Sequence, residues 1–113
     1  MGENDFDYYQ NCAAETAKYA QRDIGVPSIA YVALGLTGEA GEVAEKIKKF
    51  YRDNGDYHTT RESLKKELGD VLWYLSEAAR LWGLKLSDVA AANIQKRASR
   101  RVRDVISGSG DDR

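Results

Sequence analysis

The chain contains a single proline, Pro27, among 113 residues, and this scarcity leaves long stretches free to form helices. Apolar residues recur at the three- and four-residue spacing of amphipathic helices, and runs of β-branched residues are absent. This pattern predicts four helices, which cover residues 5–21, 29–52, 60–82 and 88–106. Because the connections are short, successive long helices should pack antiparallel. We therefore expect an all-α, four-helix chain with a long antiparallel helical hairpin as its core.

Capping residues mark the expected helix ends. Ser28 and Ser87 are suited to cap the second and fourth helices. Thr59 and Glu62 have the capping-box spacing at the start of the third helix, and Gly83 stands where a glycine would end it. These signals support the helix boundaries that the apolar spacing predicts.

The length and the tail predict one domain over residues 1–106, followed by a disordered tail over residues 107–113 that lacks apolar side chains. A core of this size is modest, which favours self-association. The 17 basic residues do not exceed the 18 acidic ones, so stable nucleic-acid binding is not expected. No apolar run approaches the roughly 18 residues that span a membrane. The single cysteine, Cys12, and the acidic N-terminus favour a cytoplasmic location.

Two pairs of carboxylates occur on the second and third predicted helices. Glu39 and Glu42 are three residues apart, and so are Glu67 and Asp70. Residues at this spacing share a helix face, and both pairs lie beside an apolar stripe. In an antiparallel hairpin the two pairs would differ in height by only roughly 6 Å. Single pairs of this kind are common on solvated helices, so the matched height is what indicates a site. Oxygen ligands without histidine or thiol suit Mg²⁺ or Mn²⁺.

The segments 33–45 (ALGLTGEAGEVAE) and 66–75 (KELGDVLWYL) together resemble the MazG-like family of all-α nucleoside triphosphate pyrophosphohydrolases. The resemblance covers roughly residues 5–103. Gly38 stands where the longer family motif has a first glutamate, which is similar to the shorter GExGE variant of single-domain relatives. The resemblance implies a bound Mg²⁺, for which Mn²⁺ can substitute. The implied metal ligands are Glu39, Glu42, Glu67 and Asp70.

The activity that this resemblance implies is hydrolysis of (deoxy)nucleoside triphosphates to the monophosphate and pyrophosphate, by water attack at the α-phosphorus. Mg²⁺ would screen the phosphate charge and lower the pKa of a bound water, whose proton Glu39 or Glu42 would accept. The family also implies a homodimer or homotetramer with sites between subunits. The substrate-binding candidates are Lys46, Lys49, Tyr74, Asn93, Lys96 and Arg97. Other aromatic candidates for the base are Tyr31, Trp73 and the pair Tyr8 and Tyr9.

Several other interpretations remain open from the sequence. A phosphoribosyl-ATP pyrophosphohydrolase or a dUTPase-like relative would share these helices and carboxylates. Glu45, Lys46 and Lys49 are spaced for simple ion pairs along the helix. A non-catalytic helical dimerisation module would tolerate loss of the carboxylates. A di-iron bundle is disfavoured because it needs Glu-x-x-His motifs, and the only histidine, His58, does not belong to one.

Overall fold

The computed structural model of the chain describes residues 5–103, 108, 110 and 111. Within this part lie four α-helices, one short 3₁₀ helix and no strand, so the predicted all-α class is confirmed. The elements are α1 (Phe6–Ala14), η1 (Lys18–Gln21), α2 (Ser28–Arg52), α3 (Tyr57–Leu81) and α4 (Leu86–Val102). The predicted disordered tail lies largely outside the described residues, as does the predicted end of the fourth helix.

The first helix is shorter than the apolar spacing predicts, because α1 ends at Ala14 and the chain continues into η1. The Thr16 hydroxyl donates a hydrogen bond of 2.8 Å to the Ala13 carbonyl, which offers the backbone an alternative to a further helical turn. The turn also carries Ala17 and Tyr19 into the core, where each is 7% exposed. Burial of these side chains therefore accounts for the break in the helix.

The predicted N-terminal caps of α2, α3 and α4 are all wrong. The α3 helix begins three residues early, because the Asp56 carboxylate accepts a hydrogen bond of 2.7 Å from the Thr59 backbone amide. Ser28 is the first residue of α2 and makes no capping bond, since Pro27 occupies the cap position. The predicted glycine end is confirmed: Gly83 has a φ of +71°, a conformation that favours glycine.

The start of α4 is held by side chains of α1 rather than by Ser87. Gln10 accepts a hydrogen bond of 3.1 Å from the Leu86 amide and donates one of 2.9 Å to the Leu84 carbonyl. The Asp7 carboxylate accepts from both the amide and the hydroxyl of Ser87, at 3.1 and 2.7 Å. The first-turn amides of α4 are thus satisfied from a distant helix, which fixes the α3–α4 turn against α1.

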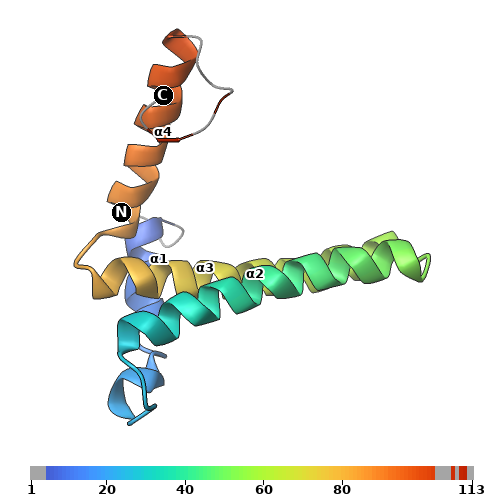
Figure 1. Cartoon of the computed structure of the whole chain (residues 1–113), viewed down its shortest axis with the longest axis horizontal. Helices are drawn as coiled ribbons and strands as arrows, with labels where there is room; N and C mark the ends of the chain where they lie inside the picture. The colour runs from blue at the N-terminus through green and yellow to red at the C-terminus, as the bar shows by residue number, and fades with distance from the viewer. Residues whose placement is uncertain (1–4, 104–107, 109, 112–113) are drawn as a thin grey trace.

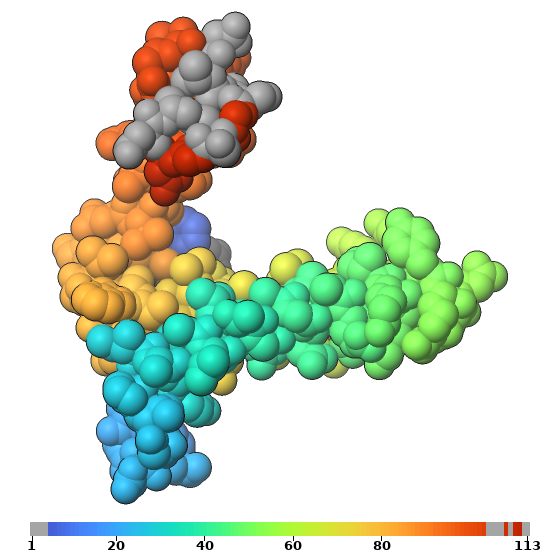
Figure 2. Space-filling model, in the orientation of Figure 1, coloured from blue at the N-terminus to red at the C-terminus, as the bar shows by residue number. Residues whose placement is uncertain are grey.

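Helices α2 and α3 lie side by side along their length and extend well beyond the rest of the molecule (Figure 1). The buried core sits at the other end of this pair, around Ala17, Tyr19 and Val32. All residues from 33 to 75 are described, and none of them is buried. We call residues 40–68 the arm. It is a slender projection in the space-filling view (Figure 2), and a two-helix layer of this kind has no interior of its own.

Helix α4 extends away from the α2–α3 pair and meets α1 and α3 near its own start (Figure 1). None of the described helices is both long enough and apolar enough to cross a membrane. The architecture is therefore a small base with two projections, the arm and α4.

Candidate metal centre

Three carboxylates from two helices meet where the arm joins the base. Glu39 of α2 and Glu67 and Asp70 of α3 each offer an oxygen, and these atoms lie within 4.8 Å of one another. Glu39 and Glu67 are half-buried, whereas Asp70 is exposed. The sequence expectation that the two carboxylate pairs lie at matched height on adjacent helices is consistent with this group.

A close approach between the helices lies one turn from these carboxylates. A Cβ atom on Gly35 would stand only 2.1 Å from Cε1 of Tyr74, so only glycine lets this ring lie against α2. Gly35 precedes Glu39 by four residues, and Tyr74 follows Asp70 by four, so the contact shares their helix faces. The missing side chain at position 35 therefore helps to set how close the carboxylates of the two helices come.

The electrostatics of the group favour a cation. Partial burial raises the pKa of the Glu39 carboxyl, and the negative charges of Asp70, Glu67 and Glu42 raise it further. The Lys46 ammonium lies 3.9 Å from Oε1 of Glu67, and is the cation that α2 supplies across the helix pair. Like charges held this close are relieved by a proton or by a metal ion.

Glu42 is not a member of the group of three. Its carboxylate is exposed, one turn further along α2, although its charge contributes to the raised pKa of Glu39. Lys49 pairs with Glu45 at 3.6 Å, and Lys48 pairs with the same carboxylate at 3.0 Å. The interpretation of Glu45 as an ion-pair partner of neighbouring lysines is confirmed.

Tyr74 lies near the carboxylates, and further aromatic side chains continue from it toward the buried core. The rings of Trp73 and Tyr74 meet edge to face, with centroids 5.0 Å apart. The pKa of the Tyr74 hydroxyl is raised by burial first, then by hydrogen bonding and charge coupling with Tyr31, and then by the charges of Glu39 and Asp70. Tyr74 therefore lies within electrostatic reach of the metal-binding candidates. We call Tyr31, Trp73 and Tyr74 the aromatic wall.

Tyr9 of α1 also faces this region. Burial raises the pKa of its hydroxyl, and the charge of Asp70 raises it further. Helix α1 thus contributes a side chain near the carboxylates, although the carboxylates themselves all lie on α2 and α3.

The candidates on α4 are placed apart from the carboxylates in the single chain, because α4 extends away from the arm (Figure 1). Asn93 and Lys96 line a shallow hollow along α4. The Lys96 ammonium lies 3.2 Å from Oδ1 of Asp111, and Arg97 is exposed. Their predicted role in substrate binding stays a prediction.

Sequence reasoning missed an ion pair between a buried carboxylate and an arginine at the base of the molecule. The Glu77 side chain is fully buried, and Arg80 grips its carboxylate through two hydrogen bonds of 2.7 Å. The Tyr19 hydroxyl donates a further hydrogen bond of 2.5 Å to Glu77. The only local signal is the spacing of three between Glu77 and Arg80, which is common on exposed helix faces.

Comparison with known proteins shows the family to which the chain belongs. A family model described as the MazG nucleotide pyrophosphohydrolase domain matches residues 28–104, which include both carboxylate-bearing helices and all described residues of α4. The chain is also similar to the "Gene 37 protein" of Mycobacterium phage L5, with 44% identity over 111 residues that cover 95% of this chain and 97% of that protein. No solved structure matches. On the strength of the family match, this chain belongs to the MazG nucleotide pyrophosphohydrolase family.

Proposed function

We propose that this protein is a Mg²⁺-dependent hydrolase that converts (deoxy)nucleoside triphosphates to the monophosphate and pyrophosphate. The observation that carries this proposal is the group of three carboxylates within 4.8 Å, in a chain of the MazG family. A triphosphate carries several negative charges, and such a group repels it unless a cation lies between them. A carboxylate cluster at a nucleotide site is therefore best explained as a metal centre.

The donor set fits a hard divalent cation. All three groups are carboxylates, and oxygen is the ligand that Mg²⁺ and Mn²⁺ prefer. Glu39, Glu67 and Asp70 would hold the ion. Once bound, the ion supplies charge screening for the triphosphate and lowers the pKa of a coordinated water.

The remaining steps fall to other side chains of the arm and the base. Glu42 stands outside the group of three and is exposed, so its carboxylate is available to accept the proton of the attacking water. Lys46 and Lys49 follow on the same helix and would meet the phosphates. Tyr74 offers an aromatic face beside the carboxylates on which a base can rest.

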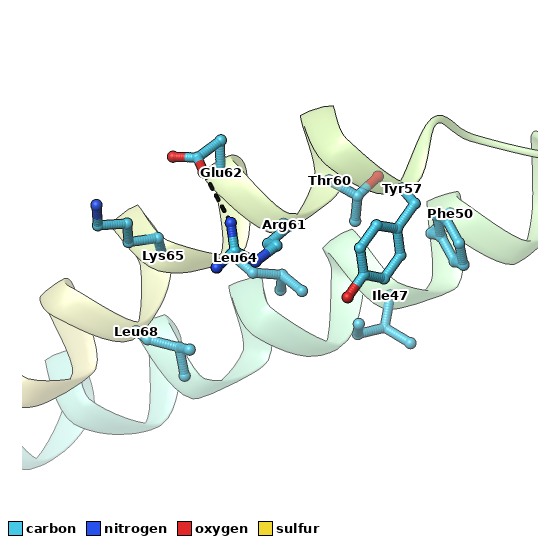
Figure 3. A pocket seen from close by; sticks show the side chains of 9 residues that line it. All are labelled: Ile47, Phe50, Tyr57, Thr60, Arg61, Glu62, Leu64, Lys65 and Leu68. Atoms are coloured by element: carbon cyan, nitrogen blue, oxygen red, sulfur yellow. Dashed lines mark hydrogen bonds and ion pairs between the residues drawn. The ribbon is translucent and has the colours of Figure 1, made fainter.

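We further propose that the α2–α3 pair is the antiparallel core of a homodimer or homotetramer. The arm has no buried residue, yet it presents a groove of about 440 Å³ (Figure 3). Apolar side chains from both helices face this groove, namely Ile47, Phe50, Tyr57, Leu64 and Leu68. A second arm laid along it would bury these side chains and remove apolar surface from water. The same association would give the α4 residues Asn93, Lys96 and Arg97 a route to a partner's carboxylates.

A product assay tests the reaction. The purified protein is incubated with each ribo- and deoxyribonucleoside triphosphate, with Mg²⁺ or with EDTA, and the products are separated. We expect monophosphate and pyrophosphate with Mg²⁺, no turnover with EDTA, and a loss of at least about 100-fold in Glu67→Gln. The matched control Glu45→Gln, which changes an ion-paired glutamate of α2, should keep wild-type turnover.

Other products would refute parts of the proposal. Stepwise release of inorganic phosphate would show that water attacks the terminal phosphorus and not the α-phosphorus. Turnover that persists in EDTA would exclude the metal centre. No turnover of any nucleoside triphosphate, in a folded protein that binds Mg²⁺, would favour a phosphoribosyl-ATP substrate instead.

A further inference from the structure

The buried carboxylate of Glu77 is fully paired without taking part in the metal centre. Burial opposes its ionisation, but the hydrogen bonds from Arg80 and Tyr19 outweigh burial and hold its pKa below the usual range. Burial and the bond to Glu77 in turn raise the pKa of Tyr19 to about 12. Glu77 is therefore a fixed negative charge, and the Tyr19 hydroxyl is a fixed donor to it.

This ion pair contributes little stability compared with apolar side chains of similar volume, because the fully buried Glu77 carboxylate loses its hydration, whereas the Arg80 side chain stays 37% exposed. What it does supply is a defined geometry. Arg80 binds both oxygens of Glu77, which fixes the plane of the carboxylate. The Tyr19 hydroxyl meets one of these oxygens at 2.5 Å, so the ring of Tyr19 has a single orientation relative to α3.

The ring of Tyr19 is in turn packed against the aromatic wall. It stacks on Tyr31 with centroids 5.2 Å apart and planes inclined by 25°. It also meets Trp73 edge to face at 6.1 Å. A hydrogen bond of 2.9 Å from Nε1 of Trp73 to the Thr16 hydroxyl holds the indole on its other side. A series of contacts therefore leads from Glu77 through Tyr19 and Trp73 to Tyr74, whose hydroxyl is within reach of the charges of Glu39 and Asp70.

We propose that Glu77 is a positioning residue, which acts through Tyr19 to hold the aromatic wall in the orientation that receives the base of a nucleotide bound at the carboxylates. This inference rests on the proposed function, since it assigns the wall to the base of the same substrate. Glu77 touches neither the substrate nor the metal. It prepares one side of the binding site before the nucleotide arrives, which lowers the ordering cost of binding.

The substitution Tyr19→Phe tests this inference, because it removes the hydroxyl and keeps the ring. The matched control is Tyr51→Phe, an exposed tyrosine of the arm that is 20 residues from Tyr31, or roughly 30 Å along one helix. All proteins carry Trp82→Phe at an exposed position, so that Trp73, the other of the two tryptophans, is the only indole. The measurements are KM and kcat for the preferred nucleoside triphosphate, Mn²⁺ affinity without nucleotide, and the fluorescence anisotropy of Trp73.

We expect Tyr19→Phe to raise KM by about three- to tenfold, while kcat and Mn²⁺ affinity change by less than about twofold. The anisotropy of Trp73 should fall, because the ring at position 19 is no longer held by Glu77 and restricts the indole less. Tyr51→Phe should leave all four quantities unchanged. If Tyr19→Phe does not fold, Arg80→Lys keeps the charge but loosens the grip on Glu77, and the same rise in KM is required of it.

Two outcomes would overturn the inference, and they are distinguishable. In the first, the parent protein is active, and Tyr19→Phe lowers only the unfolding temperature and leaves KM and the Trp73 anisotropy unchanged. That result would show that Glu77 only stabilises the folded core. A parent protein that hydrolyses no nucleotide would refute the proposed function, and the inference would fall with it.

Discussion

Asp70→Asn should make the metal-free protein more stable and at the same time abolish its stabilisation by metal. The three carboxylate oxygens lie within 4.8 Å of one another, and two unit charges at that distance repel by about 0.9 kcal/mol in water and more in a less polar surrounding. Asp70 is exposed, so the lower value applies. It repels both Glu39 and Glu67, and the nearby Lys46 offsets part of this. A net gain of about 1 kcal/mol follows, or roughly 4–8 °C in Tm for a chain of this length.

The effect of metal has the opposite sign. An ion that binds only the folded protein stabilises it by about 2.7 kcal/mol when its concentration is 100 times Kd. The wild-type protein should gain this stability in Mg²⁺ or Mn²⁺, whereas Asp70→Asn lacks one of three charged ligands and should gain little. The variant is thus expected to melt above the wild type in EDTA and below it in saturating metal.

Thermal unfolding followed by circular dichroism at 222 nm measures both effects. Glu45→Gln is the matched control, because it neutralises a glutamate of α2 whose partners are Lys48 and Lys49. It should show no gain in EDTA and full protection by metal. The reasoning is refuted if Asp70→Asn melts below the wild type in EDTA, or if metal protects it as strongly as the wild type.

Three further predictions concern the same region. Lys46→Met should tighten Mn²⁺ binding in a titration by about two- to fivefold, because it removes a cation that lies 3.9 Å from Glu67, a proposed metal ligand. The same substitution should raise KM for the nucleotide, and weaker Mn²⁺ binding would contradict the reasoning. Gly35→Ala should cost about 1–3 kcal/mol in chemical denaturation, because its Cβ would stand 2.1 Å from Tyr74, whereas Gly38→Ala, whose Cβ meets nothing within 4 Å, should stabilise the helix. Because the folded pKa of Glu39 lies above its ordinary 4.5, the native state holds more protons there than the unfolded state, and this carboxyl should lower stability in EDTA as pH rises through its folded pKa. Protection by metal should instead grow over the same pH range, and a pH-independent difference in Tm would refute the assignment.

Helical periodicity predicted the all-α class, and residue spacing predicted the pairs Glu39/Glu42 and Glu67/Asp70 at matched heights, because both depend on the regular rise of a helix. The structure groups only Glu39, Glu67 and Asp70, and Glu42 lies outside the group. The break after Ala14 could not be predicted in this way. It depends on the burial of Tyr19, whose partner Glu77 is 58 residues distant in the sequence. Local apolar spacing carries no information about such a contact.

The helix caps also depend on contacts that the local sequence does not reveal. Asp56 and Thr59 are both good capping residues, and the sequence alone does not decide which of them begins α3. At α4 the amide of Ser87 is satisfied by Asp7, 80 residues away, so no local motif identifies the cap. The residues that position the site are therefore the least visible in the sequence, whereas the carboxylates themselves are the most visible.

The α2–α3 pair carries both the candidate metal ligands and the proposed surface of self-association. The carboxylates project from the stretch 33–75, in which the single chain buries no residue, and the groove beside them is lined by apolar side chains such as Ile47 and Leu68. In the proposed dimer, a partner arm in this groove would restrict the helices that carry the metal ligands. Ordering these helices favours metal binding, because less conformational freedom is then lost when the ion binds. Since such coupling is reciprocal, metal would strengthen association by the same factor by which association strengthens metal binding. In the proposed dimer, metal affinity should therefore rise as the protein assembles.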